Sequence, residues 1–447
     1  MALKSRQPGR VLGYVRNTAL SLAALVAAGV VFVGPQTPGL LTRAYLYGLP
    51  GYEIARARDT AQTLGQQPLN NLVHNRQLAG YKTRLITTPN NDTLYSSGFL
   101  DLSEGPVSIT VPVFGPRYYS LAFIDAYTNN FAIIGQRTIG GNGAHLLVVP
   151  PGWTGAAPQG VTVVRSPTPQ IWLLVRILID GPQDLGTVHQ LQDQIVITGP
   201  ATSALPAIHV PPLAQSTGGA FVRVVNQVLA EDPPPAADAP ELQALAAVGI
   251  GANAPPLSWR QRLLWHVAYP LLEGSLIKAT EVRTNLVNGW SYSNPDIGNF
   301  GTDYAYRAAV ALRGLLALPQ EEAIYTTPVV DDQGQPLDGS HSYSLHLAAG
   351  TPPAKAFWSL TAYAPDPDGR LYFTDNVIHR YSFGDRTAGL VRNADGSIDI
   401  LIQHDQPASG NWLPVPAGHF VLTMRAYLPG ADLQDGTFHY PPLHRLN

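Results

Sequence analysis

Four short polar side chains stand in a row at Asn90-Asn91-Asp92-Thr93, and Tyr95 follows two residues later. Their oxygens can hydrogen-bond a hydroxyl-rich or carboxylate ligand, and Asp92 can serve as an acid or base where desolvation raises its pKa. The alternative is an Asx-type turn, in which the same side chains satisfy nearby backbone groups. Pro89 favours an extended conformation for Thr88 just before this row.

The polar row interrupts a sequence that otherwise favours β-strands, from Arg84-Leu-Ile86 to Leu94-Tyr95. Such a break in local consistency is tolerated where the polar groups are used. We therefore predict that Asn91 and Asp92 line the main polar cleft. Arg117 or Arg137 is expected within reach of them, and Tyr127 is expected to complete the wall.

Guanidinium groups in apolar strands are costly unless they are paired. One set of arginines lies in or beside strand-like apolar text: Arg117, Arg137, Arg176, Arg380 and Arg425. One interpretation is an internal ion pair with a carboxylate such as Asp125 or Asp180. The other is that two of these arginines converge on one cleft and clamp a ligand carboxylate or phosphate.

Aromatic side chains that stay exposed can stack on sugar rings or other planar faces. The candidates are Trp172, Trp290, Trp358 and Trp412. Trp412, in Asn411-Trp-Leu-Pro414, is the best candidate for lining a pocket, although a structural role in the core remains the alternative.

Familiar catalytic and metal-binding signatures are missing. No Gly-x-Ser-x-Gly elbow occurs, and Ser275-Leu-Ile-Lys278 matches Ser-x-x-Lys without the companion motifs of penicillin-recognising enzymes. The 12 histidines are scattered without zinc-ligand spacing, and the chain has no cysteine. We expect neither a cofactor nor a metal ion from these patterns.

Composition narrows the function classes. Only 13% of the 447 residues are charged, against about 25% in an average soluble domain, and 28 Lys and Arg stand against 31 Asp and Glu. Since no basic run follows the first sixteen residues, a nucleic-acid partner is not expected. With 45% hydrophobic residues, the chain can bury at least one large core.

Segments with a strand-like hydrophobic pattern and segments with a helical one follow each other along the chain. Short apolar runs between turn residues, such as Val107–Val111 and His145–Val149, predict antiparallel sheet. Helical spacing at Phe221–Leu229, at Trp259–Leu286 with a kink at Pro270, and at Asp303–Leu318 predicts helices. We predict a mainly β, multidomain chain with two antiparallel, jelly-roll-like β-sandwiches at 50–182 and 326–440 and a helical middle segment at 183–325.

The two β segments resemble each other. Tyr119-Ser-Leu-Ala-Phe-Ile124 with Gly135-Gln-Arg-Thr138 matches Trp358-Ser-Leu-Thr-Ala-Tyr363 with Gly384-Asp-Arg-Thr387. If this likeness is a true repeat, it indicates two related sandwiches on either side of the helical segment.

The N-terminal 36 residues have the order of an export signal. Lys4, Arg6, Arg10 and Arg16 precede an apolar run from Ala19 to Gly34. Because Phe32-Val-Gly-Pro35 is a poor cleavage site, we predict an uncleaved anchor in the bacterial inner membrane, with the rest of the chain in the periplasm. The alternative is a cleaved signal and a secreted or periplasmic protein.

Several motifs together resemble a known family. Pro89-Asn-Asn-Asp-Thr-Leu-Tyr95, Arg117-Tyr-Tyr-Ser-Leu121, Asp125-Ala-Tyr-Thr-Asn129 and Gly135-Gln-Arg-Thr138 resemble the bacterial domain of unknown function 1254. Phe357-Trp-Ser-Leu360, Asn411-Trp-Leu-Pro414 and Arg425-Ala-Tyr427 resemble its companion, domain of unknown function 1214. The resemblance implies two sandwiches in an exported protein, and it implies no particular reaction.

Two function classes stay open. The first is an envelope enzyme, a hydrolase or lyase that acts on a polar small molecule or glycan with Asp92 and a nearby Arg or Tyr. The second is a non-catalytic ligand-binding or scaffold protein, in which the polar row is structural. A concave polar cleft at Asp92 favours the first, and flat surfaces with unshifted carboxylates favour the second.

Overall fold

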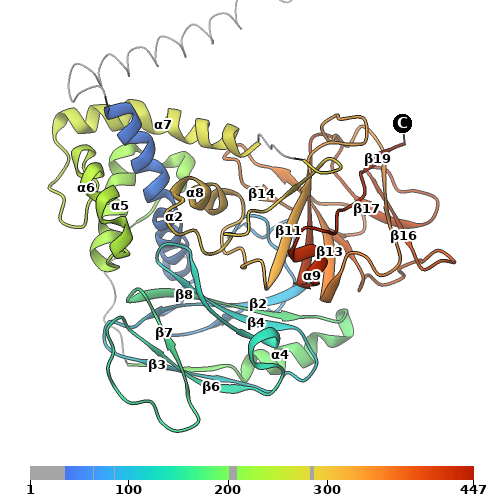
Figure 1. Ribbon diagram of the computed structural model, residues 1–447, viewed down its shortest axis with the longest axis horizontal. Coiled ribbons are helices and arrows are strands. Elements are labelled where there is room, and N and C mark those ends of the chain that lie inside the picture. The colour runs from blue at the N-terminus through green and yellow to red at the C-terminus, as the bar shows by residue number, and fades with distance from the viewer. Residues whose placement is uncertain (1–35, 64, 85, 201–208, 282–285, 447) are drawn as a thin grey trace, which may run out of the picture.

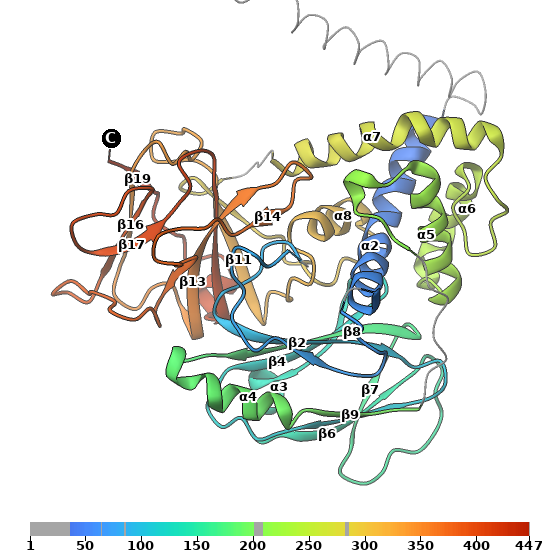
Figure 2. The ribbon, with the colours of Figure 1, turned by 180° about the vertical axis from the view of Figure 1, so that it is seen from behind.

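The computed structural model describes residues 36–63, 65–84, 86–200, 209–281 and 286–446. In this part the chain is mainly β, with helices gathered at one edge (Figures 1 and 2). The prediction of a mainly β chain with helices is therefore confirmed. The predicted N-terminal anchor lies outside the described residues. Within them, no helix is both long enough and apolar enough to cross a bilayer.

The first β unit consists of two sheets that share one hydrophobic core. The strand order of one sheet is β1 (Val73–His74), β2 (Thr93–Asp101), β8 (Gln170–Leu178), β4 (Tyr119–Asp125) and β5 (Asn130–Gly135). The other has the order β7 (Thr162–Arg165), β6 (Ala144–Val149), β3 (Val107–Val111) and β9 (Val196–Thr198). Leu121 and Leu173 of the first sheet meet Ile109 and Val148 of the second in this core.

The second β unit is built in the same way. One sheet has the order β10 (Trp290–Tyr292), β11 (Ala323–Pro328), β18 (Val421–Pro429), β13 (Ala354–Pro365) and β14 (Leu371–Tyr372), and β15 (Ser382–Gly384) also pairs with β13. The other has the order β17 (Asn411–Pro414), β16 (Ile398–Gln403), β12 (Tyr343–Leu347) and β19 (His444–Arg445). Leu360 and Met424 meet Leu345 and Ile400 between these sheets.

The register confirms the internal repeat. Ser120 on β4 pairs with Gly135 on β5, and Ser359 on β13 pairs with Gly384 on β15. A Cβ on either glycine would lie within 2.4 Å of a backbone oxygen, on Tyr119 in one unit and on Trp358 in the other. Apart from β14, the strands of the two units follow the same order, including a parallel pair in each second sheet.

Helices pack together between the two β units and at one edge of the molecule (Figure 1). The longer ones are α2 (Thr37–Thr63), α5 (Gly218–Glu231), α6 (Ala239–Leu245), α7 (Trp259–Glu281) and α8 (Tyr304–Arg313). Helix α4 (Leu185–Asp193) lies apart from them and packs into the core of the first β unit. Single turns form α3 (Gln136–Ile139) and α9 (Ala431–Gln434). The sequence predicts Thr302 or Asp303 as the N-cap of α8, and in the structure Asp303 is the cap, with its side chain accepting a hydrogen bond from the backbone N–H of Tyr306.

Two features of the helices differ from the expectation. The helical spacing from Trp259 predicts a buried face that includes Leu263 and Leu264, yet on α7 Leu263 is exposed while Leu264 is buried. Neighbouring residues point about 100° apart on a helix, so only one of them faces the core. Residue 50, where the first β unit was expected to begin, lies inside α2, and β9 extends that unit beyond 182. Helix α2 is buried on most sides, so its sequence lacks the periodicity of a surface helix.

Candidate functional site

A cavity of about 720 Å³ lies where three helices meet both β units. Its walls come from α2, α7 and α8, and its floor comes from β2, β8, β11 and β18. The helical wall residues are mostly aliphatic: Leu41, Leu46, Ala268, Leu271, Leu272, Leu276, Ala309 and Val310. Most of the cavity therefore suits an apolar molecule rather than a sugar or another polar solute.

Two buried arginines form the polar end of the cavity. Arg176 on β8 is 6% exposed, and Arg425 on β18 is 3% exposed. Tyr95 lies beside Arg176 on β2 with its ring centroid 5.7 Å from the guanidinium carbon, and Tyr325 lies 6.0 Å from that of Arg425. Aromatic rings stabilise a guanidinium and leave its N–H groups available for an anion.

The hydrogen-bond partners of the two arginines differ. Nη1 of Arg425 donates to Oγ1 of Thr361 at 3.0 Å, and Nη2 donates to the Thr88 carbonyl at 2.8 Å. Nη2 of Arg176 donates to the Leu316 carbonyl at 2.9 Å, whereas its buried Nη1 has no hydrogen-bond partner among the described residues. A buried cationic donor without a partner costs free energy, so Arg176 is suited to receive an acceptor from a ligand.

Phenol and amide groups complete the polar end. Burial raises the pKa of both Tyr325 and Tyr427, so their hydroxyls stay protonated at neutral pH and remain donors. The Tyr427 hydroxyl accepts a hydrogen bond from Nδ2 of Asn90 at 2.9 Å. Because Asn90 belongs to the first β unit and Tyr427 to the second, this contact joins the two units at the cavity floor.

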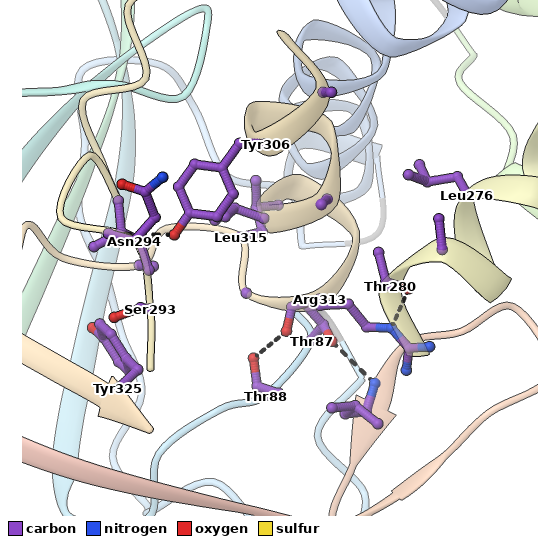
Figure 3. A pocket seen from close by; sticks show the side chains of 18 of the residues that line it. Thr87, Thr88, Leu276, Thr280, Ser293, Asn294, Tyr306, Arg313, Leu315 and Tyr325 are labelled. Carbon is purple, nitrogen blue, oxygen red and sulfur yellow. Dashed lines mark hydrogen bonds between the residues drawn. The ribbon is translucent and has the colours of Figure 1, made fainter. Parts of the chain in front are cut away.

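The rim is held by hydrogen bonds between elements that are far apart in the sequence. Nε of Arg313, at the end of α8, donates to Oγ1 of Thr280 on α7 at 3.0 Å (Figure 3). The Thr88 hydroxyl donates to the Arg313 carbonyl at 2.9 Å, and Thr87 Oγ1 accepts from Leu371 N–H at 3.0 Å. These contacts fix the 87–88 segment against α8 and β14.

Thr88 is not extended, contrary to the expectation from Pro89. Its φ is 46°, in the left-handed region that a threonine rarely adopts. Three contacts hold it there: its N–H donates to Leu371, its hydroxyl donates to Arg313, and its carbonyl accepts from Arg425. Strain of this kind persists where the surroundings over-determine the conformation, and it is common at binding sites.

Of the predicted site residues, Asn90 and Tyr95 line the cavity. Oδ1 of Asn90 accepts hydrogen bonds from the backbone N–H groups of Asp92 and Thr93 and from the Thr93 hydroxyl. The polar row thus forms the Asx-type turn that we considered as the alternative.

Asn91, Asp92 and Thr93 are not among the residues that line this cavity. Asn91 donates to the Ala79 carbonyl, and Thr93 is buried. Oδ2 of Asp92 accepts from the Ser359 hydroxyl at 2.7 Å, across the contact between the two β units. Burial raises the pKa of the Asp92 carboxyl to about 6.

The remaining candidates are not among the residues that line the cavity either, and each has a partner within the described part of the chain. Arg117 pairs with Asp184, and Nε of Arg137 donates to Glu322 at 2.7 Å. The Tyr127 hydroxyl donates to the Asp232 carbonyl in the helical core. The Trp412 indole N–H donates to the Gln403 carbonyl at 3.0 Å, and its side chain is buried.

Sequence reasoning placed Arg176 and Arg425 in a set of five arginines, with an internal ion pair or the convergence of two of them on one cleft as the alternatives, and it did not say which two would converge. A sharper signal was available: each stands inside a nearly uninterrupted apolar strand, QIWLLVRIL in β8 and VLTMRAYLP in β18. The aliphatic walls gave no signal, because their spacing is that of ordinary core helices. Among the described residues, no group of three or more metal-ligating side chains comes together.

Comparisons with known proteins identify two regions of this chain. Residues 69–199 match the protein family of unknown function DUF1254, and residues 322–431 match the family DUF1214. The crystal structure of the VPA0106 protein from Vibrio parahaemolyticus is similar over 92% of this chain and 100% of its own, with 26% identity and a TM-score of 0.65. A protein from Burkholderia cenocepacia has 12% identity and a TM-score of 0.48 over 97% of this chain and 96% of its own. No curated protein matches.

Proposed function

We propose that this chain, which belongs to the proteins that join a DUF1254 domain to a DUF1214 domain, binds an amphipathic small molecule in the helix-walled cavity. Arg176 receives an anionic head group, a carboxylate or a phosphate, and the helices enclose the apolar part. The observation that carries the proposal is the buried Nη1 of Arg176, which has no partner among the described residues.

Several features support this choice over a polar or glycan substrate. The aliphatic walls exclude water and offer few hydrogen bonds to a sugar. The floor has two cationic guanidinium groups, and no carboxylate of the described residues lies within 4 Å of either Arg176 or Arg425. Asp92, the acid or base of the hydrolase or lyase alternative, is not among the lining residues.

The binding test uses cis-parinaric acid, a fluorescent fatty acid, and its uncharged methyl ester. Energy transfer from the protein tryptophans separates bound probe from probe dissolved in detergent. Because a hydrogen bond to a charged group contributes about 1.5–3 kcal/mol, Arg176→Gln is expected to weaken binding of the acid by about 10- to 100-fold. Binding of the methyl ester should change little.

Arg380→Gln is the matched control, because Arg380 is half-buried, donates to the Trp412 carbonyl and lies outside the cavity. This variant should bind both probes like the unchanged protein. If Arg176→Gln bound the acid and the ester as tightly as the control does, the assignment of the head group to Arg176 would be wrong.

We also propose an inner-membrane anchor at residues 19–34 and a jelly-roll-like sandwich for each β unit. The apolar sequence after a basic flank supports the anchor. The two sheets around one core in each unit support the sandwich. A reporter fused to the C-terminus tests the topology: activity of a reporter that works only in the cytoplasm would contradict it.

A further inference from the structure

The mouth of the cavity lies between three helices. Among the lining residues, those exposed to solvent on helices are Thr42 on α2, Ser275 and Ala279 on α7, and Ala305 on α8. Pro38, in the first turn of α2, also lines the cavity. The lining of the cavity therefore reaches solvent near the first turns of α2.

The start of α2 is also where the predicted anchor joins the described part of the chain. The apolar run ends at Gly34, and α2 begins at Thr37. Three extended residues span about 10 Å at most. An anchor that ends at Gly34 therefore keeps the membrane next to the first turn of α2 and to the cavity mouth.

Helix α7 presents apolar side chains to solvent on the same edge of the molecule. Trp259 is 59% exposed and Leu263 is 48% exposed, one helical turn apart. In both views α7 runs along the top edge beside the start of α2, whereas β3 and β6 lie near the opposite edge (Figures 1 and 2). Exposed Trp and Leu on one side of a helix favour the boundary between head groups and acyl chains.

The charges of α7 complement an acidic membrane. Arg260, Arg262 and Lys278 are exposed, Glu273 is half-buried, and the exposed Glu281 at the C-terminal end lies 3.6 Å from the guanidinium of Arg313. Basic side chains near a surface are attracted to acidic lipids with about 1 kcal/mol each, so their removal weakens contact about fivefold per charge.

We propose that α7 and the first turn of α2 lie on an acidic lipid bilayer, so that the cavity exchanges its amphipathic ligand with that bilayer. The exchange rests on the proposed function of the cavity, whereas the contact of α7 with lipid does not. The juxtaposition of the cavity mouth, the predicted anchor junction and the exposed Trp259 and Leu263 is what carries this inference.

Site-specific labelling of the full chain tests the contact, since the protein has no cysteine of its own. Leu263→Cys carries a nitrobenzoxadiazole probe, and the protein is reconstituted in vesicles of phosphatidylethanolamine and phosphatidylglycerol with nitroxide-labelled acyl chains. The emission should shift to the blue and lose intensity through quenching. The control is Val113→Cys, because Val113 is 68% exposed and follows β3, near the opposite edge. Its emission should neither shift nor be quenched.

Arg260→Gln with Lys278→Gln should reduce the quenching at position 263 in acidic vesicles and change it little in phosphatidylcholine. Equal emission at 263 and 113 would overturn the bilayer contact. The parinaric acid measurement, made on the same labelled chain in detergent, reports the cavity independently. Tight binding of the acid together with an unquenched probe would refute the membrane face and leave the proposed function intact.

Discussion

Arg176 in the first β unit and Arg425 in the second occupy corresponding positions. Arg176 pairs in register with Tyr95 on one side and Ser120 on the other, and Arg425 pairs with Tyr325 and Ser359 in the same way. Both terminal nitrogens of Arg425 have a hydrogen-bond partner, whereas Nη1 of Arg176 has none among the described residues. The two units thus carry arginines at equivalent positions. Arg425 is bound on both terminal nitrogens by the protein, and Arg176 keeps one terminal nitrogen that could bind the proposed ligand.

The acidic residues just before β2 and β11 show a second contrast. Asp92 and Glu322 each stand three residues before the tyrosine that pairs with the arginine. Glu322 is bound by Arg137 and by the Tyr118 hydroxyl at 2.9 Å, both from the other unit. The Asp92 carboxylate accepts a hydrogen bond from the neutral Ser359 hydroxyl, and the Arg425 guanidinium and the Ser382 hydroxyl also favour its charged form. Among the described residues, the Glu322 carboxylate therefore has a cation in direct contact, whereas the Asp92 carboxylate has none within 4 Å.

The largest expected change in the free energy of unfolding follows from breaking the ion pair between Arg137 and Glu322. Arg137→Gln removes the cation from a fully buried Glu322 and is expected to lower the free energy of unfolding by about 3–5 kcal/mol at neutral pH. Urea unfolding measures it. Arg176→Gln, which leaves no acid uncompensated, should stay within about 1 kcal/mol of the unchanged protein.

Acid should reduce the Arg137→Gln defect, because burial raises the pKa of Glu322 and protonation then removes the uncompensated charge. Equal losses of stability for Arg137→Gln and Arg176→Gln would mean that the two arginines do not differ as their partners indicate.

The next effect concerns Asp92. Its pKa is about 6 in the folded protein against 3.8 as a free side chain, so the folded state binds the proton more tightly. The free energy of unfolding therefore falls as pH rises from about 4 to 6. Asp92→Asn lacks this loss. The variant is expected to match the unchanged protein below pH 4 and to exceed it by up to about 3 kcal/mol above pH 6, less the screening by solvent at this half-buried site.

Asp232→Asn is a useful companion variant, since burial raises the pKa of Asp232 to about 7 at a position away from the contact between the β units. Its stability difference should develop over a higher pH range. A difference for Asp92→Asn that does not depend on pH would show that the carboxyl titrates normally in the folded state.

The smallest effects test the equivalence of the two units. Thr138 and Thr387 each accept a hydrogen bond from a glycine N–H, Gly135 at 2.9 Å and Gly384 at 2.8 Å. Thr138→Ala and Thr387→Ala are each expected to lower the free energy of unfolding by about 1 kcal/mol. Thermal unfolding of the two variants under one condition compares them. If the two variants lost free energies of unfolding that differed by much more than about 1 kcal/mol, the two units would be equivalent in their backbone but not in this side-chain hydrogen bond.

Local patterns were enough for the strands and for several helix ends. The predicted strand Val107–Val111 agrees with β3, and Asp303 caps α8 as expected. The extent of α2 could not be read in this way, because Ala44, Tyr45 and Leu49 are buried on different sides of it. Tertiary packing, rather than periodicity, determines a helix of that kind.

The site was predictable only in part, for a related reason. Asn90 and Tyr95 are close in sequence, and the break in strand texture marked them. Arg117 finds Asp184 67 residues away and Arg137 finds Glu322 185 residues away. No local pattern tells which arginine obtains such a partner and which, like Arg176, does not.

The cavity floor is composite, because Asn90 and Arg176 come from one β unit and Tyr427 and Arg425 come from the other. A ligand that touches all four binds only when the units are docked. By thermodynamic linkage, ligand binding must then strengthen the docking of the two units by the same factor by which docking strengthens binding. Because both units belong to one chain, their association is intramolecular and does not depend on the protein concentration.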